Sequence, residues 1–179
     1  MLPVDNAYGE WPRSGEIDIM EARGNDESYS KQGINYVRGS LNWGPLSWLN
    51  AVYKTYGYWY MRRGSYAETF HTYSLEWTED FIRIYVDSRL HHLMEMKIKN
   101  SFWNYGDFPA VVQNGTDSIA LTNPWVNGTN AAPFDQSTFF FPFPLPSSTL
   151  MLIIEFYRVL FDSEYGCGRH EWVVPGWCW

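Results

Sequence analysis

The sequence predicts an all-β fold made of short strands and many turns. Segments rich in β-branched and aromatic residues recur along the 179-residue chain, and no long stretch has the apolar periodicity of an amphipathic helix. The 14 glycines and 10 prolines are spread throughout, which suits short strands joined by turns.

The strand signals follow one another along the chain. Tyr36–Trp43 and Thr69–Trp77 are rich in β-branched and aromatic residues. In Phe81–Val86, aliphatic residues alternate with aromatic and charged ones, as expected of a strand with one buried face. Asp87-Ser88 then predicts a turn, and Arg89–Ile98 a return strand.

The composition changes abruptly after Gln136. Residues 139–146 read Phe-Phe-Phe-Pro-Phe-Pro-Leu-Pro, followed by three hydroxylated residues and the apolar run Leu150–Ile154. Alternating prolines cannot donate to a strand ladder, and so many exposed phenylalanines would favour aggregation. We therefore predict one domain over residues 1–136 and an anomalous segment over 137–179. That segment is either a Pro-rich linker or sequence foreign to the domain.

The charge pattern argues against two kinds of partner. The formal net charge is -7 and no Lys/Arg cluster interrupts it, so neither nucleic acid nor an anionic membrane surface is expected to bind. No apolar run reaches the roughly 18 residues of a membrane span. The first five residues lack the basic and apolar regions of a signal peptide. Two glycosylation sequons, at Asn114 and Asn127, are compatible with secretion.

Aromatic residues make up 19% of the chain, and they have two readings. They can fill the core of a β-sandwich, or their flat rings can stack on the apolar C–H faces of sugars. Composition alone leaves both open.

Glu16, Asp18 and Glu21 form the motif most informative about chemistry. On a strand, Glu16 and Asp18 share one face while the isoleucines between them point to the other. Simple alternation would place Glu21 on the isoleucine face. One extra residue in a β-bulge, most naturally Met20, would return Glu21 to the face of the other carboxylates.

Such a carboxylate row permits retaining glycoside hydrolysis. That reaction needs an ionised nucleophile and a protonated acid roughly 5–5.5 Å apart. The extended Cα atoms of Glu16 and Glu21 would be about 13 Å apart, so the long side chains and the bulge must close the gap. Asp18 between them would disfavour full ionisation of the group. The alternative is a solvated acidic strand face with an apolar back.

The residues around the motif carry a family resemblance. The stretch from Trp11 to Asn25 resembles the catalytic strand of glycoside hydrolase family 16, in the bulged form associated with β-1,3-glucan cleavage. Further segments over residues 1–136 are similar to the family, most of all to its fungal, laminarinase-like members: residues 40–45, 70–77 and 123–136.

The resemblance implies a fold and roles. The implied fold is a concanavalin A-like jelly-roll β-sandwich with a glucan cleft across its concave sheet. By motif position, Glu16 would be the nucleophile, Glu21 the general acid/base, and Asp18 an assistant that acts through hydrogen bonding and charge. The implied reaction is endo-acting, retaining hydrolysis of β-1,3-linked or mixed β-1,3/1,4 glucans.

Three residues are candidates for substrate binding. Trp11 would stack on a sugar near the scissile bond, although it could instead pack in the core. Asn42 and Trp43 are cleft candidates that could instead only pack the neighbouring strand. His71 and the pair His91-His92 lack metal-ligand partners at motif spacing, and we interpret them as structural or surface residues.

The chain departs from the family pattern at both ends. Residues like Met1-Leu2-Pro3 occur mid-chain in the family, so the predicted sandwich is incomplete at its amino-terminal end. From Ser163 to Trp179, codons read one base later could encode the Gly-Gly-Thr-Asn-Gly-Trp segment expected of the family. We interpret the region after Gln136 as intron-derived sequence followed by family sequence in a shifted frame, which makes the sandwich incomplete at its carboxyl-terminal end as well.

The resemblance also sets expectations for partners and place. β-Glucan is the expected partner, the protein a monomer, and the full-length form extracellular or in the cell wall. Catalysis would need no cofactor; family members often carry a structural Ca²⁺, for which we assign no ligands. Two alternatives remain: a non-catalytic, lectin-like glucan-binding protein, and an inactive fragment from an incorrectly assembled gene.

Overall fold

The computed structural model describes residues 1–26, 28–29, 32–139 and 152–158. Their regular secondary structure is mostly β-strand, with one short α-helix and two 3₁₀ turns, which confirms the all-β prediction. The elements in order are β1 Leu2–Pro3, β2 Glu16–Glu21, β3 Tyr36–Asn42, 3₁₀ turns Ser47–Leu49 and Val52–Lys54, β4 Tyr56–Tyr60, β5 His71–Trp77, β6 Phe81–Val86, β7 His92–Lys97, α1 Phe102–Gly106, β8 Val111–Asn114, β9 Asp117–Ala120, β10 Thr138–Phe139 and β11 Leu152–Arg158.

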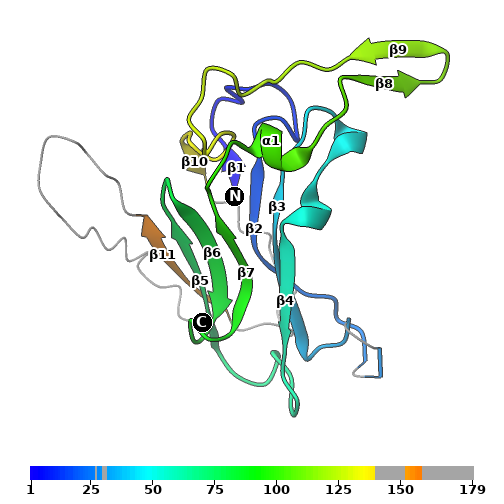
Figure 1. The fold of residues 1–179 in the computed structure, drawn as a ribbon. Helices are drawn as coiled ribbons and strands as arrows, with labels where there is room; N and C mark the ends of the chain where they lie inside the picture. Colours follow the sequence, from blue (N-terminus) through cyan, green and yellow to red (C-terminus); the bar gives the residue numbers. More distant parts are fainter. Residues whose placement is uncertain (27, 30–31, 140–151, 159–179) are drawn as a thin grey trace, which may run out of the picture.

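Two sheets form the body (Figure 1). One has the antiparallel order β2-β3-β4, and the other has the order β11-β5-β6-β7, in which β11 pairs parallel with β5. The short strands β1 and β10 pair with each other, and β8 and β9 form a hairpin that projects from the body. The predicted strands Tyr36–Trp43, Thr69–Trp77, Phe81–Val86 and Arg89–Ile98 correspond to β3, β5, β6 and β7.

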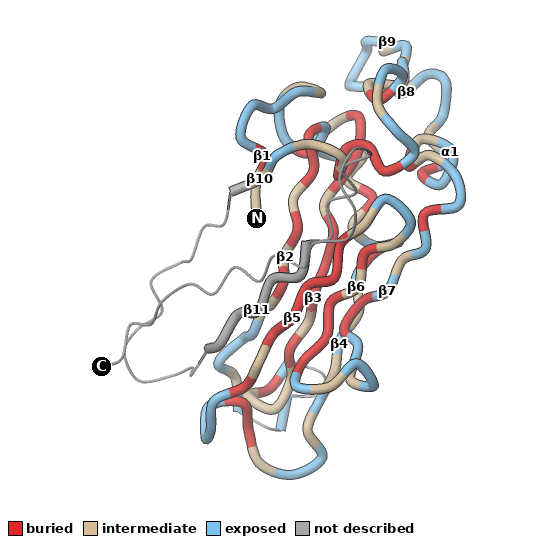
Figure 2. The backbone as a smooth tube through the Cα atoms, turned by 90° about the vertical axis from the view of Figure 1, so that its left-hand side faces the viewer, coloured by how far each residue is buried: buried red, intermediate tan, exposed pale blue. Residues whose placement is uncertain are grey.

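The core lies between the two sheets, and the buried positions of Figure 2 follow their strands. Ile17 and Ile19 of β2 point into it, as the alternation predicted. A Cβ at Gly39 of β3 would lie 3.1 Å from Ile84 of β6, and one at Gly57 of β4 would overlap the backbone of Leu93 in β7. These close approaches seat β3 and β4 directly on the second sheet and leave the opposite face of β2-β3-β4 outside the core.

The anomalous segment predicted after Gln136 is described only in part. Residues 152–158 form β11, whereas the Phe/Pro run beyond residue 139 and the whole of 163–179 lie outside the described residues. Within the described part of the chain, no helix reaches the length and hydrophobicity that a membrane crossing requires.

Candidate active site

The strand β2 presents its carboxylates on the face away from the core. Ile17 and Ile19 are buried while Glu16 and Asp18 are only partly buried. Asp18 pairs with Ser40 of β3, but Glu21 pairs with Arg38, so three steps along β2 match two along β3. One extra residue therefore lies between Asp18 and Glu21, as in a β-bulge. The bulge was predicted at this place, and it returns Glu21 to the outer face.

Contacts to a single hydroxyl show that the bulge brings two carboxylates together. The Ser40 Oγ lies 2.9 Å from Asp18 Oδ2 and 3.1 Å from Glu21 Oε2. A serine hydroxyl carries one proton and can donate fully to only one acceptor at a time. Both short contacts are satisfied together when one of the two carboxyls is protonated and donates to Ser40. The three groups thus form a path along which a proton can be shared.

Each of the three carboxylates also has a donor of its own. The Trp11 indole N–H donates to Glu16 Oε2 at 2.9 Å. Asn42 Nδ2 donates to Asp18 Oδ2 at 2.6 Å, and its own carbonyl accepts from Asn50. Arg38 Nε donates to Glu21 Oε2 at 2.6 Å, a charge-assisted bond across the sheet.

The electrostatics of the row favour a retained proton. Three carboxylates share this face with the Arg38 guanidinium, and the Met1 ammonium also interacts with Asp18 and Glu16. Burial raises the pKa of Asp18 from its ordinary 3.8 to about 6, and the neighbouring charge of Glu16 adds to this; the hydrogen bond from Ser40 opposes it. Asp18 therefore keeps its proton to a higher pH than an exposed aspartate does.

The loop before β2 is fastened to the rest of the domain, and it positions Trp11. Arg13 Nε donates to the Pro45 carbonyl at 2.6 Å, and the Trp125 indole donates to the Arg13 carbonyl at 2.7 Å. Gly15 has a φ of +77°, and a Cβ there would lie 2.9 Å from the Phe134 ring. Only glycine fits both conditions at the entrance to β2.

The structure separates the three predicted substrate-binding residues. Trp11 is 46% exposed beside Glu16, so it is free to meet a ligand. Asn42 faces the carboxylates and contacts Asp18. Trp43, its neighbour in sequence, points the other way: it is fully buried, donates to Thr55 Oγ1 at 2.7 Å and packs on Phe102. Trp43 thus packs the core, which was the alternative reading of this residue.

Sequence reasoning missed the donors on β3 and the aromatic surface on β4. Ser40 and Arg38 are found only through the pairing of β2 with β3. The alternation of tyrosines in Tyr56–Tyr60 is a local signal for another strand with one exposed face, but this strand was not predicted from the sequence.

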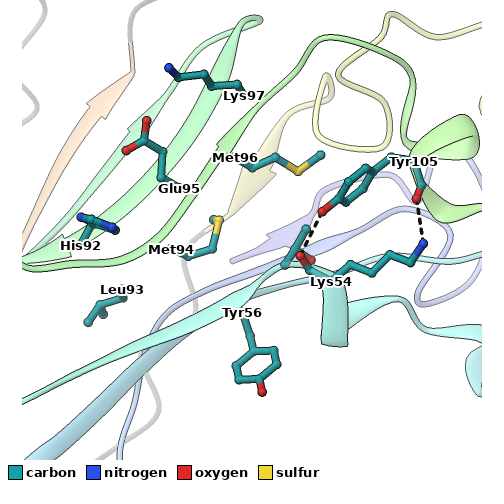
Figure 3. A pocket seen from close by; sticks show the side chains of 10 residues that line it. Lys54, Tyr56, His92, Leu93, Met94, Glu95, Met96, Lys97 and Tyr105 are labelled. Carbon is teal, nitrogen blue, oxygen red and sulfur yellow. Dashed lines mark hydrogen bonds between the residues drawn. The ribbon is translucent and has the colours of Figure 1, made fainter.

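A hollow of about 340 Å³ lies between β4 and β7, and its lining does not include Glu16, Asp18 or Glu21. Figure 3 shows its lining: Lys54, Thr55, Tyr56, His92, Leu93, Met94, Glu95, Met96, Lys97 and Tyr105. The Lys54 ammonium is engaged within the fold, because its Nζ donates to the carbonyls of Tyr105 and Gly106 at the end of α1. The ring of Tyr56 points away from Met94 and Met96.

The histidines that we interpreted as structural or surface residues contact other side chains or line the hollow. His71 is buried, with Nδ1 2.8 Å from Asp87, and the His91 ring stacks on Trp59. Among the described residues, no three His, Cys, Asp or Glu side chains are grouped so that they could hold a metal ion.

Comparison with known proteins places these residues in context. The profile of Glycosyl hydrolases family 16 matches residues 5–136, and it ends at the residue after which the composition changes. That match also supports a jelly-roll β-sandwich for the two packed sheets.

Three relatives cover parts of the same region. A beta-1,3-glucan-binding protein of Penaeus monodon is 38% identical over 136 residues, which is 76% of this chain and 34% of that protein. A glucan endo-1,3-beta-glucosidase A1 of Niallia circulans is 35% identical over 103 residues, 58% of this chain and 13% of that protein. A glucan endo-1,3-beta-glucosidase of Cryptopygus antarcticus is 27% identical over 143 residues, 76% of this chain and 47% of that protein. The chain thus spans less than half the length of each, and no solved structure matches it.

Proposed function

Because the chain belongs to glycosyl hydrolase family 16, we propose that its protein is an extracellular endo-glucanase that cleaves β-1,3-linked or mixed β-1,3/1,4 glucans with retention of configuration. The observation that carries this proposal is the bulged strand β2, whose carboxylates share one outer face and one Ser40 contact. A merely solvated acidic face does not require a buried serine between two of its carboxylates.

We assign the attack to Glu16. The neutral Trp11 indole donates to its carboxylate, and this carboxylate attacks the anomeric carbon. The bond from Trp11 also fixes one carboxylate oxygen and leaves the other to react. As the bond from the sugar to the leaving oxygen breaks, a glycosyl ester forms on Glu16.

We assign the proton transfer to Glu21. Its side chain is 42% exposed and therefore open to substrate and water. In the first step it gives a proton to the leaving oxygen; in the second it takes one from the water that hydrolyses the ester. The Asp18–Ser40–Glu21 path can carry a proton to Glu21, since Asp18 retains one to about pH 6.

Asp18 and Asn42 act as positioning residues in this scheme. Asp18 receives donors from Ser40 and Asn42 on the same oxygen, and it stands between the two reacting glutamates. Its hydrogen bonds hold the row in one arrangement, and repulsion between its charge and those of the two glutamates opposes the simultaneous ionisation of all three carboxyls.

The second candidate function is glucan binding without cleavage. It is favoured by the Penaeus monodon relative, which is named a beta-1,3-glucan-binding protein. The intact set of Glu16, Asp18 and Glu21 favours the enzyme, because binding alone needs no paired carboxylates.

Reducing-sugar release from laminarin separates the two functions. The unchanged chain should release reducing ends, and Glu16→Gln should bind laminarin without release. Binding by both proteins with release by neither would replace the enzyme with a glucan-binding protein.

A further inference from the structure

The strand β4 carries a row of exposed tyrosines next to the carboxylates. Tyr56, Tyr58 and Tyr60 alternate with Gly57 and Trp59, and they are 49%, 37% and 51% exposed. Solvent-exposed aromatic rings in a continuous row are unusual on a protein surface and mark a binding site more often than scattered ones do.

The strand pairing puts this row on the carboxylate face. Tyr56 is opposite Ser40, which is opposite Asp18; Tyr58 is opposite Arg38, which is opposite Glu21. Directly paired residues of antiparallel strands point to the same side of a sheet. The contact of the Arg38 guanidinium, 5.8 Å from the centre of the Tyr56 ring, agrees, since the same guanidinium binds Glu21.

The packing of β4 keeps these rings outside. Gly57 lies against the backbone of Leu93, and Trp59 is packed against the core, so the inward face of β4 is occupied by the second sheet. Tyr58 is held in place by Tyr36 of β3, whose ring lies 4.9 Å away with 29° between the planes. The row is thus a preformed surface, and ordering it on binding costs little entropy.

We propose that the tyrosines of β4, with Tyr58 at their centre, bind the β-glucan chain at units remote from the scissile bond. This rests on the proposed function and extends its site. Neighbouring strands lie about 4.8 Å apart, so β4 is about 10 Å from the carboxylates of β2, a distance that a short oligosaccharide spans. A glucan that crosses the strands would meet Trp11 and the carboxylates first and the tyrosines afterwards.

The chemistry of the row suits a sugar chain better than an apolar protein segment. Each tyrosine offers a flat face for sugar C–H groups and a hydroxyl for sugar hydroxyls. The surface is continuous with a carboxylate site that the same polymer would occupy. The Arg38 guanidinium beside the row is engaged by Glu21 and Tyr56 and does not call for an anionic partner.

The test is the affinity of Tyr58→Ala for laminarin, measured by titration calorimetry in a Glu16→Gln background where no turnover occurs. We expect a loss of roughly three- to tenfold, from the lost stacking, and recovery in Tyr58→Phe, which keeps the ring. The matched control is Tyr53→Ala: Tyr53 is 66% exposed but lies in the 3₁₀ turn Val52–Lys54.

The outcomes separate this inference from the proposed function. Equal laminarin affinity for Tyr58→Ala and Tyr53→Ala, with both folded by circular dichroism, overturns the tyrosine site whether or not the chain is an enzyme. Weaker binding by Tyr58→Ala alone supports it, even if reducing-sugar assays show no hydrolysis. Absence of laminarin binding by the unchanged chain overturns both.

Discussion

The two halves of the outer face of sheet β2-β3-β4 differ in kind. The half formed by β2 and β3 is charged and closely hydrogen-bonded, with Asp18 and Glu21 joined through Ser40. The half formed by β4 is aromatic, and its tyrosines have exposed rings. The first half holds groups that can transfer protons and attack carbon, and the second offers only area and hydroxyls. Chemistry and chain binding can therefore be altered separately, and the substitutions below exploit this.

The largest effect is expected on the charged half, from Glu16→Gln. Replacing the nucleophile should lower laminarin hydrolysis by about 10³-fold or more, while laminarin affinity changes little because the tyrosines remain. Initial rates of reducing-sugar release, measured beside calorimetric binding, check this. Equal losses of rate and affinity would mean that Glu16 only binds substrate.

Glu21→Gln should come next and should depend on the leaving group. Loss of a general acid costs roughly 10²- to 10⁴-fold, but an aryl glucoside with a good leaving group needs little protonation. We therefore expect a far smaller loss on the aryl substrate than on laminarin. A loss of the same size on both would contradict the acid role of Glu21.

Asp18→Asn tests the electrostatics of the row through stability. The folded pKa of Asp18 is raised from 3.8 to about 6, so the folded state binds a proton more tightly than the unfolded chain does. Stability attributable to this group is then fully present below about pH 4, falls as the pH rises to about 6, and is level above. Relative to Asp18→Asn, the unchanged chain should lose about 2 kcal/mol across this window. Urea unfolding at pH 4 and pH 7 measures it, and an opposite trend would contradict the assignment.

Ser40→Ala should have the smallest effect. Loss of a buried hydroxyl that donates to a carboxylate costs about 1–2 kcal/mol of stability, and the donor that opposes the raised pKa of Asp18 disappears. The pH profile of hydrolysis should therefore move to higher pH, with a modest loss of rate. Thr at this position keeps a hydroxyl and should restore the profile; an unchanged profile in Ser40→Ala would remove Ser40 from the proton path.

The same two halves show what sequence could and could not predict. The spacing of Glu16, Asp18 and Glu21 predicted the bulge, because the face to which each side chain of one strand points is a local property. Strand parity also bears on Asn42 and Trp43, since neighbours on a strand cannot both face the cleft. Ser40, Arg38 and the tyrosine row depend on the register of three strands far apart in sequence, which no local pattern fixes. The strand β4 was missed because its apolar character is almost entirely aromatic and includes Gly57, so it lacks the aliphatic alternation that marked β6.

The central claim is that paired carboxylates on β2 cleave β-glucan by double displacement. Proton NMR of laminarin during the first minutes of reaction tests it directly, because newly formed reducing ends show their anomeric configuration before mutarotation. We predict that the β-anomer forms first and that Glu16→Gln yields no product. Initial release of the α-anomer, or release that survives Glu16→Gln, would contradict the claim.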